Sequence, residues 1–513
     1  MPESSYLSPG VYVEEIPSAI RPIAGVSTTT AGFVGIVPDK IEIPQENPKY
    51  DPTGRSADPD SKFPYLTPMP KFQFLDDDAQ KGLADAITAA KKQLDAATAA
   101  AAKQPLTNET LKALRDARSA LAKATADQQA STMADAGTPV LCTSFSDFKK
   151  YFGDFSIDGL GPPAPSGGAP AKEGAPGTPT PYPGQSQLAH GVYGFFNNQG
   201  VRCYVMRFKS FVELKSPDAL VPFEAIDEIF QVAAPGITDE VVQQNIIDHC
   251  VNMGDRFAIL DCRMDVGATD ATDHDLSAEN VLTPSAAGGK AEKALGNTDY
   301  GAFYFPWLSV YDPATGLMDP TGEGLIDAAP SGHVAGIYAR VDNTRGVHKA
   351  PANEVVRGAE EIGVQVSKPL QDGLNPRGVN CIRIINDNVT VWGARTIGGD
   401  ANADTKYISV RRTLLFLRKS IDQGTNWVVF EPNNEDTWAK IIRNVTNFLT
   451  NVWRDGALFG STPEEAFYVK CDAELNTPAV RDLGQLITEI GVAIVRPAEF
   501  VIFRITQWQA PQA

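Results

Sequence analysis

The sequence lacks the motifs by which nucleotide-binding proteins and many hydrolases are recognised. Neither GxGxxG nor GxxxxGK[ST] occurs in its 513 residues, so no phosphate-binding loop is predicted. Ser331 and His333 are not part of a GxSxG nucleophile elbow, and the five histidines form neither HExxH nor HxH. We therefore predict that the protein is not an enzyme and uses no cofactor.

Positive charge and long apolar runs are also scarce. The chain has 45 Lys and Arg against 63 Asp and Glu, a formal net charge of -18, which argues against nucleic acid as a partner. No stretch approaches 18 consecutive apolar residues, and MPESSYLSPG lacks the pattern of a secretory signal peptide. We expect a protein made in the bacterial cytoplasm without a signal peptide and not inserted directly into a membrane.

Cysteines are few, and none forms a CxxC pair. They lie mostly within apolar runs, so we predict buried reduced thiols rather than a zinc site or a disulfide framework. The six positions are Cys142, Cys203, Cys250, Cys262, Cys381 and Cys471.

One acidic loop resembles a metal site in composition only. Asp265, Asp270, Asp273 and Asp275 surround His274, and their oxygens could hold calcium. The glycine and terminal glutamate of an EF-hand loop are missing, so a solvated acidic loop is favoured and no metal site is predicted.

Several stretches do have clear periodicity. Residues 25–37 favour a core strand, and alanine-rich residues 76–103 and 107–133 favour a helical hairpin followed by a Pro/Gly loop at 159–184. Between 186 and 375, helix 238–253 alternates with buried strands at 202–208, 256–262 and 301–310, which predicts an α/β domain. Further on, we expect helices at 407–421, 435–454 and 478–490 and strands at 427–430 and 466–470.

Both ends of the chain have the pattern of extended strands. Val11, Tyr12, Val13, Glu14 and Glu15 form the centre of one candidate, and Phe500, Val501, Ile502, Phe503, Arg504 and Ile505 form the other. A terminal strand must find a partner for its backbone groups, so we predict that both arms pair with neighbouring subunits. The linkers at residues 17–22 and 493–497 are expected to flex.

Five motifs then point to one family. SPGVYVEEIPS, SGHVAGIYARVDNTRGVHKAPAN, LNPRGVNCIRI, VWGART and YISVRRTLLFLRKSI resemble, in this order, the sheath proteins of contractile phage tails and related injection systems. The resemblance covers the first 35 residues and most of the last 320. It implies that DNTRGVHKAPAN is a shared turn with Arg345 and Lys349 in polar contacts.

The fold expected from the patterns and this resemblance is an α+β and α/β multidomain chain. The expected parts are an N-terminal arm (1–22), an inner sheath domain (23–37 with 376–498), an inserted outer region with the hairpin (38–185), an α/β middle domain (186–375) and a C-terminal arm strand (499–513).

The resemblance also implies a function. Subunits of this kind stack as six-fold rings around an inner tube protein, bind baseplate and terminal cap proteins, and contract from a metastable extended state as part of a phage tail-like particle. Arg411, Arg412, Arg418 and Lys419 could contact the tube, although a solvated helix face explains them equally well. A bacteriophage tail sheath is the nearest alternative to an injection-system sheath, and a calcium-binding α/β hydrolase is a distant one.

Overall fold

The computed structural model describes two compact units. The described residues are 22–39, 49, 51, 56, 58, 61, 77–102, 108–130, 133–156, 184–264, 276–283, 295–311 and 325–504. Unit 1 contains Phe416–Ile494 and the chain up to Val26, and unit 2 contains Ser27–Leu415 and the segment from Val495 onward. The expected arm strand at residues 11–15 and the acidic loop at 265–275 lie outside the described residues.

Unit 2 is built around a nine-stranded sheet in the order β2-β3-β1-β4-β5-β6-β11-β12-β9. Neighbouring strands from β3 to β11 in this order are parallel, while β2, β12 and β9 join antiparallel at the margins. Parallel strands buried on both faces read as continuous apolar runs, as AGFVGI in β1 and GAFYF in β6 do. The strands are β1 Ala31–Ile36, β2 Val140–Cys142, β3 Cys203–Phe208, β4 Gln231–Ala233, β5 Phe257–Asp261, β6 Gly301–Phe305, β9 Glu354–Val355, β11 Val379–Ile385 and β12 Asn388–Val391.

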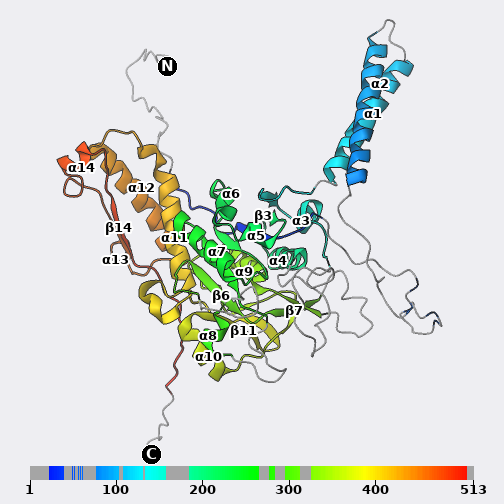
Figure 1. Ribbon diagram of the computed structural model, residues 1–513. Helices are drawn as coiled ribbons and strands as arrows, with labels where there is room; N and C mark the ends of the chain where they lie inside the picture. The colour runs from blue at the N-terminus through cyan, green and yellow to red at the C-terminus, as the bar shows by residue number, and fades with distance from the viewer. Residues whose placement is uncertain are drawn as a thin grey trace, which may run out of the picture. The chain divides into compact units, whose positions relative to one another are not determined.

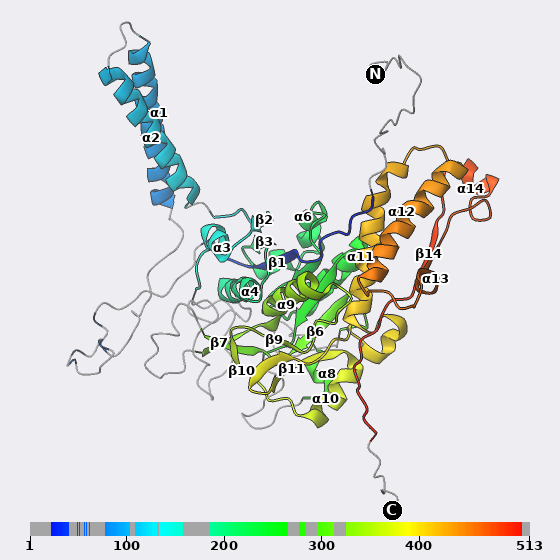
Figure 2. The same ribbon diagram turned by 180° about the vertical axis from the view of Figure 1, so that it is seen from behind.

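Helices cover both faces of this sheet (Figures 1 and 2). Phe257 of β5 contacts Tyr338 of α9 (Pro330–Arg345), whereas Ala258 shares a core with α7 (Glu240–Met253). Successive strand residues point to opposite faces, so α7 and α9 lie on opposite sides. Helix α4 (Gln185–Asn197) packs along α9 and therefore completes the layer on that side.

The strand expected at 301–310 is in fact two strands. β6 ends at Phe305, a cis peptide bond joins Phe305 to Pro306, and β7 (Leu308–Tyr311) enters a separate sheet in the order β10-β7-β8. Its other strands are β8 Leu325–Ala328 and β10 Ala359–Ile362. Proline has no backbone N–H to give to a strand ladder, so it divides the apolar run.

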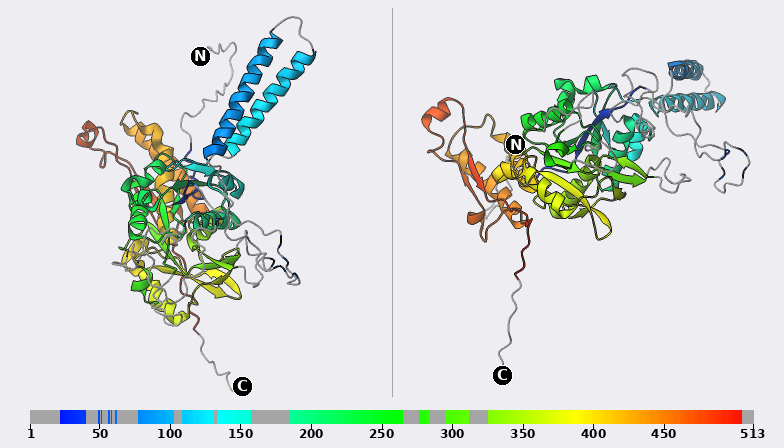
Figure 3. Two further views of the ribbon diagram at one scale, coloured as in Figure 1. Left: turned by 45° about the vertical axis from the view of Figure 1, so that its right-hand side comes forward. Right: turned by 60° about the horizontal axis from the view of Figure 1, so that its bottom comes forward.

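The alanine-rich stretches form two helices. α1 (Asp77–Ala101) and α2 (Asn108–Ala130) lie side by side along their lengths, as Figures 1 and 3 show. Ala90 and Ala117 are buried. Side chains as small as alanine let two helices approach closely, and this close approach covers them.

Unit 1 has a core between helices and a two-stranded sheet. α12 (Glu435–Arg454) is capped by Asn434, whose side chain accepts the N–H of Thr437. Its apolar stripe packs against the end of α11 (Ile408–Thr425). β13 (Phe467–Lys470) pairs antiparallel with β14 (Glu489–Val492). Short helices α13 (Pro463–Ala466) and α14 (Pro478–Asp482) complete this unit.

Two expectations in unit 1 are wrong. Residues 427–430 do not form a buried strand, because Asn426–Val428 is a 3-10 turn and Phe430 is fully exposed with φ of 68°. The helix from Pro478 stops at Asp482 and β14 follows, because Gly484 adopts a left-handed φ of 71° that ends the helical path.

The expected domain boundaries also need correction. Residues 31–36 and 379–391 were assigned to an inner sheath domain, but β1, β11 and β12 are strands of the nine-stranded sheet of unit 2. The expected linker at 493–497 is partly ordered, since Ala493 donates its N–H to Ala466 O at 2.8 Å and accepts that of Phe459 at 2.7 Å. Strand order depends on long-range pairing, which a local pattern does not contain.

The remaining elements are short or differ modestly from expectation. The expected turn DNTRGVHKAPAN is partly helical, because α9 continues through DNTR to Arg345 and the turn begins only at Gly346. Of the two residues expected in polar contacts, Arg345 is exposed, and Lys349 Nζ donates to Ala350 O at 2.6 Å. Short helices are α3 Phe145–Phe152, α5 Phe211–Leu214, α6 Val221–Glu224, α8 Ala278–Val281 and α10 Lys368–Leu374. All six cysteines are buried and free, as predicted. Among the described residues, no helix is both long and apolar enough to cross a lipid bilayer.

Candidate assembly site

The C-terminal segment of unit 2 exposes four apolar side chains in a row. Phe500, Val501, Ile502 and Phe503 are 71%, 69%, 79% and 84% exposed, and Arg504 beside them is also exposed. These residues form no strand within this chain, and Ile505 lies outside the described residues. A contiguous apolar run of this kind on a surface marks an interaction site.

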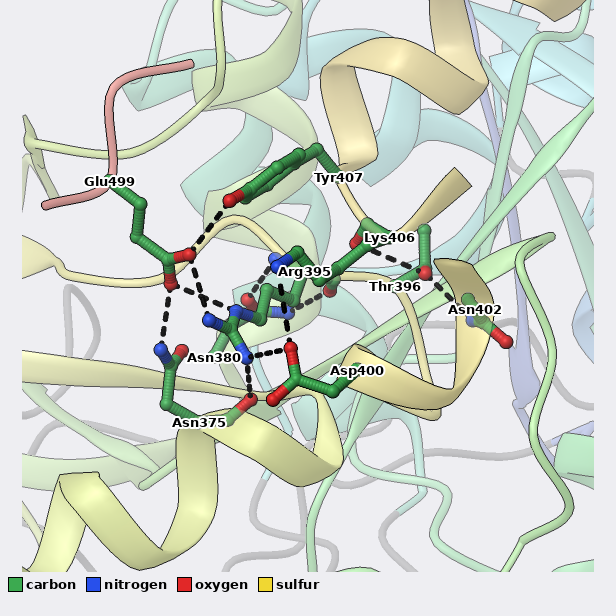
Figure 4. Close-up of polar contacts among 9 residues, drawn as sticks. All are labelled: Asn375, Asn380, Arg395, Thr396, Asp400, Asn402, Lys406, Tyr407 and Glu499. Atoms are coloured by element: carbon green, nitrogen blue, oxygen red, sulfur yellow. Dashed lines mark hydrogen bonds and ion pairs between the residues drawn. The ribbon is translucent and has the colours of Figure 1, made fainter. Parts of the chain in front are cut away.

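Glu499 fixes the chain where this segment begins (Figure 4). Its Oε1 accepts hydrogen bonds from Asn375 Nδ2 at 2.7 Å and Arg395 Nε at 2.8 Å. Its Oε2 accepts from Arg395 Nη2 at 2.8 Å and Tyr407 Oη at 3.0 Å. The paired contact with the guanidinium is the strong, directional form of an ion pair. We call Glu499, Arg395, Asn375 and Tyr407 the Glu499 clamp.

Arg395 is itself held rigidly. Its backbone N–H donates to Asn380 Oδ1 at 2.7 Å, and Asn380 Nδ2 donates back to Arg395 O at 2.8 Å and to Phe303 O at 3.2 Å. Nη1 of Arg395 donates to Asn375 O and to Asp400 Oδ1, both at 3.1 Å. The side chain is 3% exposed, so this arginine is pre-positioned by strand β11 and is nearly removed from water.

Three of the family motifs meet in this clamp. Asn375 comes from LNPRGVNCIRI, Arg395 from VWGART and Tyr407 from YISVRRTLLFLRKSI. Strands β11 and β12 lie between Asn375 and Arg395 in the sequence. The sequence predicted Phe500 to Ile505 as the arm but did not predict its attachment. The sequence did contain one sign of this attachment. Glu499 lies between Pro497 and four apolar residues, and a carboxylate at such a position is unusual within a buried strand.

The clamp changes the protonation of its members. Burial by itself would raise the pKa of Glu499, but the hydrogen bonds from Arg395 and Asn375 outweigh it, and the pKa falls below its usual range. Burial, together with the neighbouring carboxylate of Glu499, raises the pKa of Tyr407, so its hydroxyl stays a donor. The other charged groups facing the clamp are Asp400 and Lys406.

This lowered pKa gives a pH dependence with a definite sign. A carboxylate with a depressed folded-state pKa stabilises the fold fully above its ordinary pKa of 4.5, and the contribution is lost as pH falls through the lower folded value. We expect Glu499→Gln to lower the melting temperature by about 2 to 4 °C near pH 7, and this difference to shrink below about pH 4. Melting curves of both proteins between pH 3 and 8 measure it. A difference that stays constant down to pH 3 would contradict the clamp.

The basic run on α11 does not form one charged surface. Arg412 is fully buried and pairs with Asp342, so it has no surface with which to contact another protein. Lys419 is 6% exposed, and Arg411 is 3.5 Å from Asp299 and stacks on Tyr300. Arg418 is the member of this run that is exposed. The four basic side chains do not share one face because residues 411 to 419 span more than two turns and pass through every face of the helix.

The Arg412 pair is a second polar feature that the sequence did not predict. Asp342 on α9 accepts Arg412 Nη1 at 2.9 Å and Nη2 at 2.6 Å, and Thr28 Oγ1 at 2.5 Å. The guanidinium also lies over the ring of Tyr338, 4.5 Å from its centroid. These contacts join α11, α9 and the chain before β1 within unit 2.

The candidate residues for hydrolysis do not form a catalytic site. Ser331 Oγ donates to Asp261 Oδ2 at 2.6 Å, and both residues are buried in the interior. Burial raises the pKa of Asp261 to about 6 despite the hydrogen bonds from Ser331 and Gly236. The arrangement satisfies a buried carboxylate at the start of α9 and leaves no open face for a substrate. No cluster with metal-ligand spacing occurs among the described residues.

Comparison with protein families matches two parts of the chain. Residues 227–397 match the phage tail sheath protein central domain, and residues 400–507 match the phage tail sheath C-terminal domain, together more than half of the chain. The tail sheath protein of Vibrio phage KVP40 (isolate Vibrio parahaemolyticus/Japan/Matsuzaki/1991) is 25% identical over 177 residues, 34% of this chain. That match spans only 25% of the phage protein.

Solved structures resemble the chain along nearly its full length. The PVC sheath complex of an extracellular contractile injection system, in its contracted state, has a TM-score of 0.59 and 23% identity, over 98% of each chain. The contracted helical sheath of the anti-feeding prophage has a TM-score of 0.57 and 23% identity, over 98% of this chain and 100% of that one. With the shared fold and both family domains present, the chain belongs to the contractile tail sheath family, whose members are structural proteins rather than enzymes.

Proposed function

We propose that the protein is the sheath subunit of a contractile injection system. Its copies polymerise as stacked hexameric rings around an inner tube. The observation that carries this proposal is the exposed apolar run from Phe500 to Phe503 in a chain of this family. Exposing this run to water is unfavourable, and adding it as a strand to a second copy buries it and satisfies its backbone groups.

Unit 1 has a small sheet that could receive such a strand. β13 and β14 form a two-stranded sheet, and the described part of the chain adds no third strand to it. Two-stranded sheets are marginally stable alone, so additional strands stabilise them. One edge receives the C-terminal segment of a second copy. The N-terminal strand proposed at residues 11–15 provides the second donor.

Strand exchange suits a polymer whose subunits must rotate. Backbone ladders hold regardless of the orientation of the attached bodies, provided that the connecting chain bends. Contraction from a metastable extended state then draws its energy from contacts between bodies that exist only in the contracted state. The inner tube, the baseplate and a terminal cap are the other partners, and Arg418 is the proposed tube contact.

An injection particle is favoured over a bacteriophage tail. The fold of the solved injection-system sheaths is similar over 98% of this chain, and the sequence match to the phage protein covers 34% of it.

Electron microscopy of the protein expressed alone tests the proposal. We expect helical tubes from the full-length chain and none from a chain lacking residues 1–16. Ile502→Glu should reduce tubes at least about tenfold, because a charge then faces the receiving sheet.

Val212→Glu is the matched control for this variant. Val212 is 80% exposed on α5, close to the 79% of Ile502, so the same charge is added to an equally exposed aliphatic position that belongs to neither arm. Tubes should form normally in this control. Monodisperse particles from the full-length protein would rule out the sheath mechanism.

A further inference from the structure

The C-terminal segment belongs to unit 2, although the residues that precede it in sequence belong to unit 1. Ala493 and Ile494 are paired in unit 1, Ile494 through a bridge to Leu458. From Val495 onward the chain belongs to unit 2, and its next strong attachment is Glu499. Residues 495–498 alone join the two attachments.

The strengths of the polar contacts in this segment differ greatly. Glu499 accepts four hydrogen bonds and is 19% exposed, opposite an arginine that is 3% exposed. Arg496, three residues earlier, makes a 3.4 Å contact with Asp404, where the two side chains are 58% and 95% exposed. An exposed pair of this kind contributes little, whereas removing the carboxylate from Arg395 leaves a nearly buried charge with fewer partners.

The clamp also leads directly into the central sheet. Asn380, which holds the backbone of Arg395, is part of β11, and its side chain also donates to Phe303 O in the neighbouring strand β6. A force applied to residues 500–504 therefore reaches Glu499, then Arg395, and then two adjacent parallel strands of unit 2.

We propose that Glu499 is the anchor from which unit 2 presents the C-terminal strand to a second copy of the chain. This inference rests on the proposed strand exchange and specifies which part of the subunit supplies the strand. Because Glu499 is held by unit 2, the segment is free to change direction only from Phe500 onward. The donated strand therefore moves with the nine-stranded sheet of unit 2 when subunits rotate. Arg395, Asn375 and Tyr407 are positioning residues for this strand.

Two substitutions at Glu499 and one control test the anchor. Glu499→Gln removes the charge, and Glu499→Asp keeps it but shortens the side chain so that it cannot reach all four donors. Arg496→Gln removes the exposed pair in the same segment and is the control. The measurements are the mobility of a spin label attached at Ala498→Cys, an exposed position in the segment, and the yield of pelleted tubes.

We expect Glu499→Gln to increase the mobility of this label markedly and to lower the tube yield several-fold. Glu499→Asp should be intermediate, and Arg496→Gln should match the wild type in both measurements. Unchanged label mobility in Glu499→Gln would show that the clamp does not hold the segment. Higher label mobility with a normal tube yield would show that the clamp stabilises the fold without positioning the strand.

The proposed function and the anchor fail in different ways. If the wild-type chain forms no tubes, strand exchange is wrong and the anchor falls with it. If the wild-type chain and Glu499→Gln form equal tubes, strand exchange stands and only the anchor is overturned.

Discussion

Asp342→Asn is expected to lower the free energy of unfolding by about 3 to 5 kcal/mol. Asp342 and Arg412 are 2% and 0% exposed, and their side chains share two hydrogen bonds of 2.9 and 2.6 Å. An asparagine offers one acceptor oxygen and no charge, so the guanidinium stays buried without a counter-ion. Thr28 loses the same partner, because its hydroxyl donates to Asp342. Chemical denaturation measures the loss.

A double variant and a surface control make this result specific. Replacing both members, as in Asp342→Leu with Arg412→Met, removes the charge together with its partner and should recover most of the lost stability. Asp404→Asn removes a carboxylate that is 95% exposed, and it should change stability by less than about 1 kcal/mol. A loss below about 1 kcal/mol for Asp342→Asn would mean that the pair contributes little to unit 2.

Patterns of neighbouring residues predicted helices that bury one face and expose the other, and they predicted the fold class of unit 2. The stripe on residues 435–454 gave helix α12 with its bounds, because an amphipathic helix repeats its apolar positions within a few turns. The alternation of helices and buried strands gave the α/β class of unit 2. These features depend on residues close together in the sequence.

The partners of those elements could not be read in the same way. Residues 23–37 were expected in one domain with residues 376–498, yet β1 pairs with β3 and β4 in the large sheet. The sequence of a strand that is buried on both faces is apolar throughout and does not indicate which strands pair with it. Its position in the sheet therefore depends on all the other strands. The run NWVVF has the composition of a strand but forms a 3-10 turn and an exposed Phe430.

The candidate assembly site was predicted in part for the same reason. The apolar alternation of the last residues identified the arm, but the clamp needs Asn375, Arg395, Tyr407 and Glu499 to meet from positions up to 124 residues apart. Arg412 shows the opposite error. It was grouped with Arg411, Arg418 and Lys419 by proximity in sequence, whereas its partner Asp342 is 70 residues away.

Gly332→Ala is the second substitution with a large expected effect. Gly332 lies in the first turns of α9, where this helix crosses α4 at Gly191. A Cβ at position 332 would lie well inside van der Waals contact with the carbonyl oxygen and Cα of Gly191, which are backbone atoms and cannot rotate away. The helices would have to separate and open the layer over the central sheet. We expect a loss of about 3 kcal/mol or failure to fold.

The opposite outcome is expected for the same substitution at an open helical position. Gly373, in α10, has nothing within 4 Å of its added Cβ, so Gly373→Ala should stabilise the protein by about 0.5 to 1 kcal/mol through the higher helix propensity of alanine. Thermal melting of both variants separates steric contact from propensity. If Gly332→Ala left the melting temperature unchanged, α4 and α9 would have to be able to move apart freely. The contact between α4 and α9 would then not fix the layer that covers this face of the sheet.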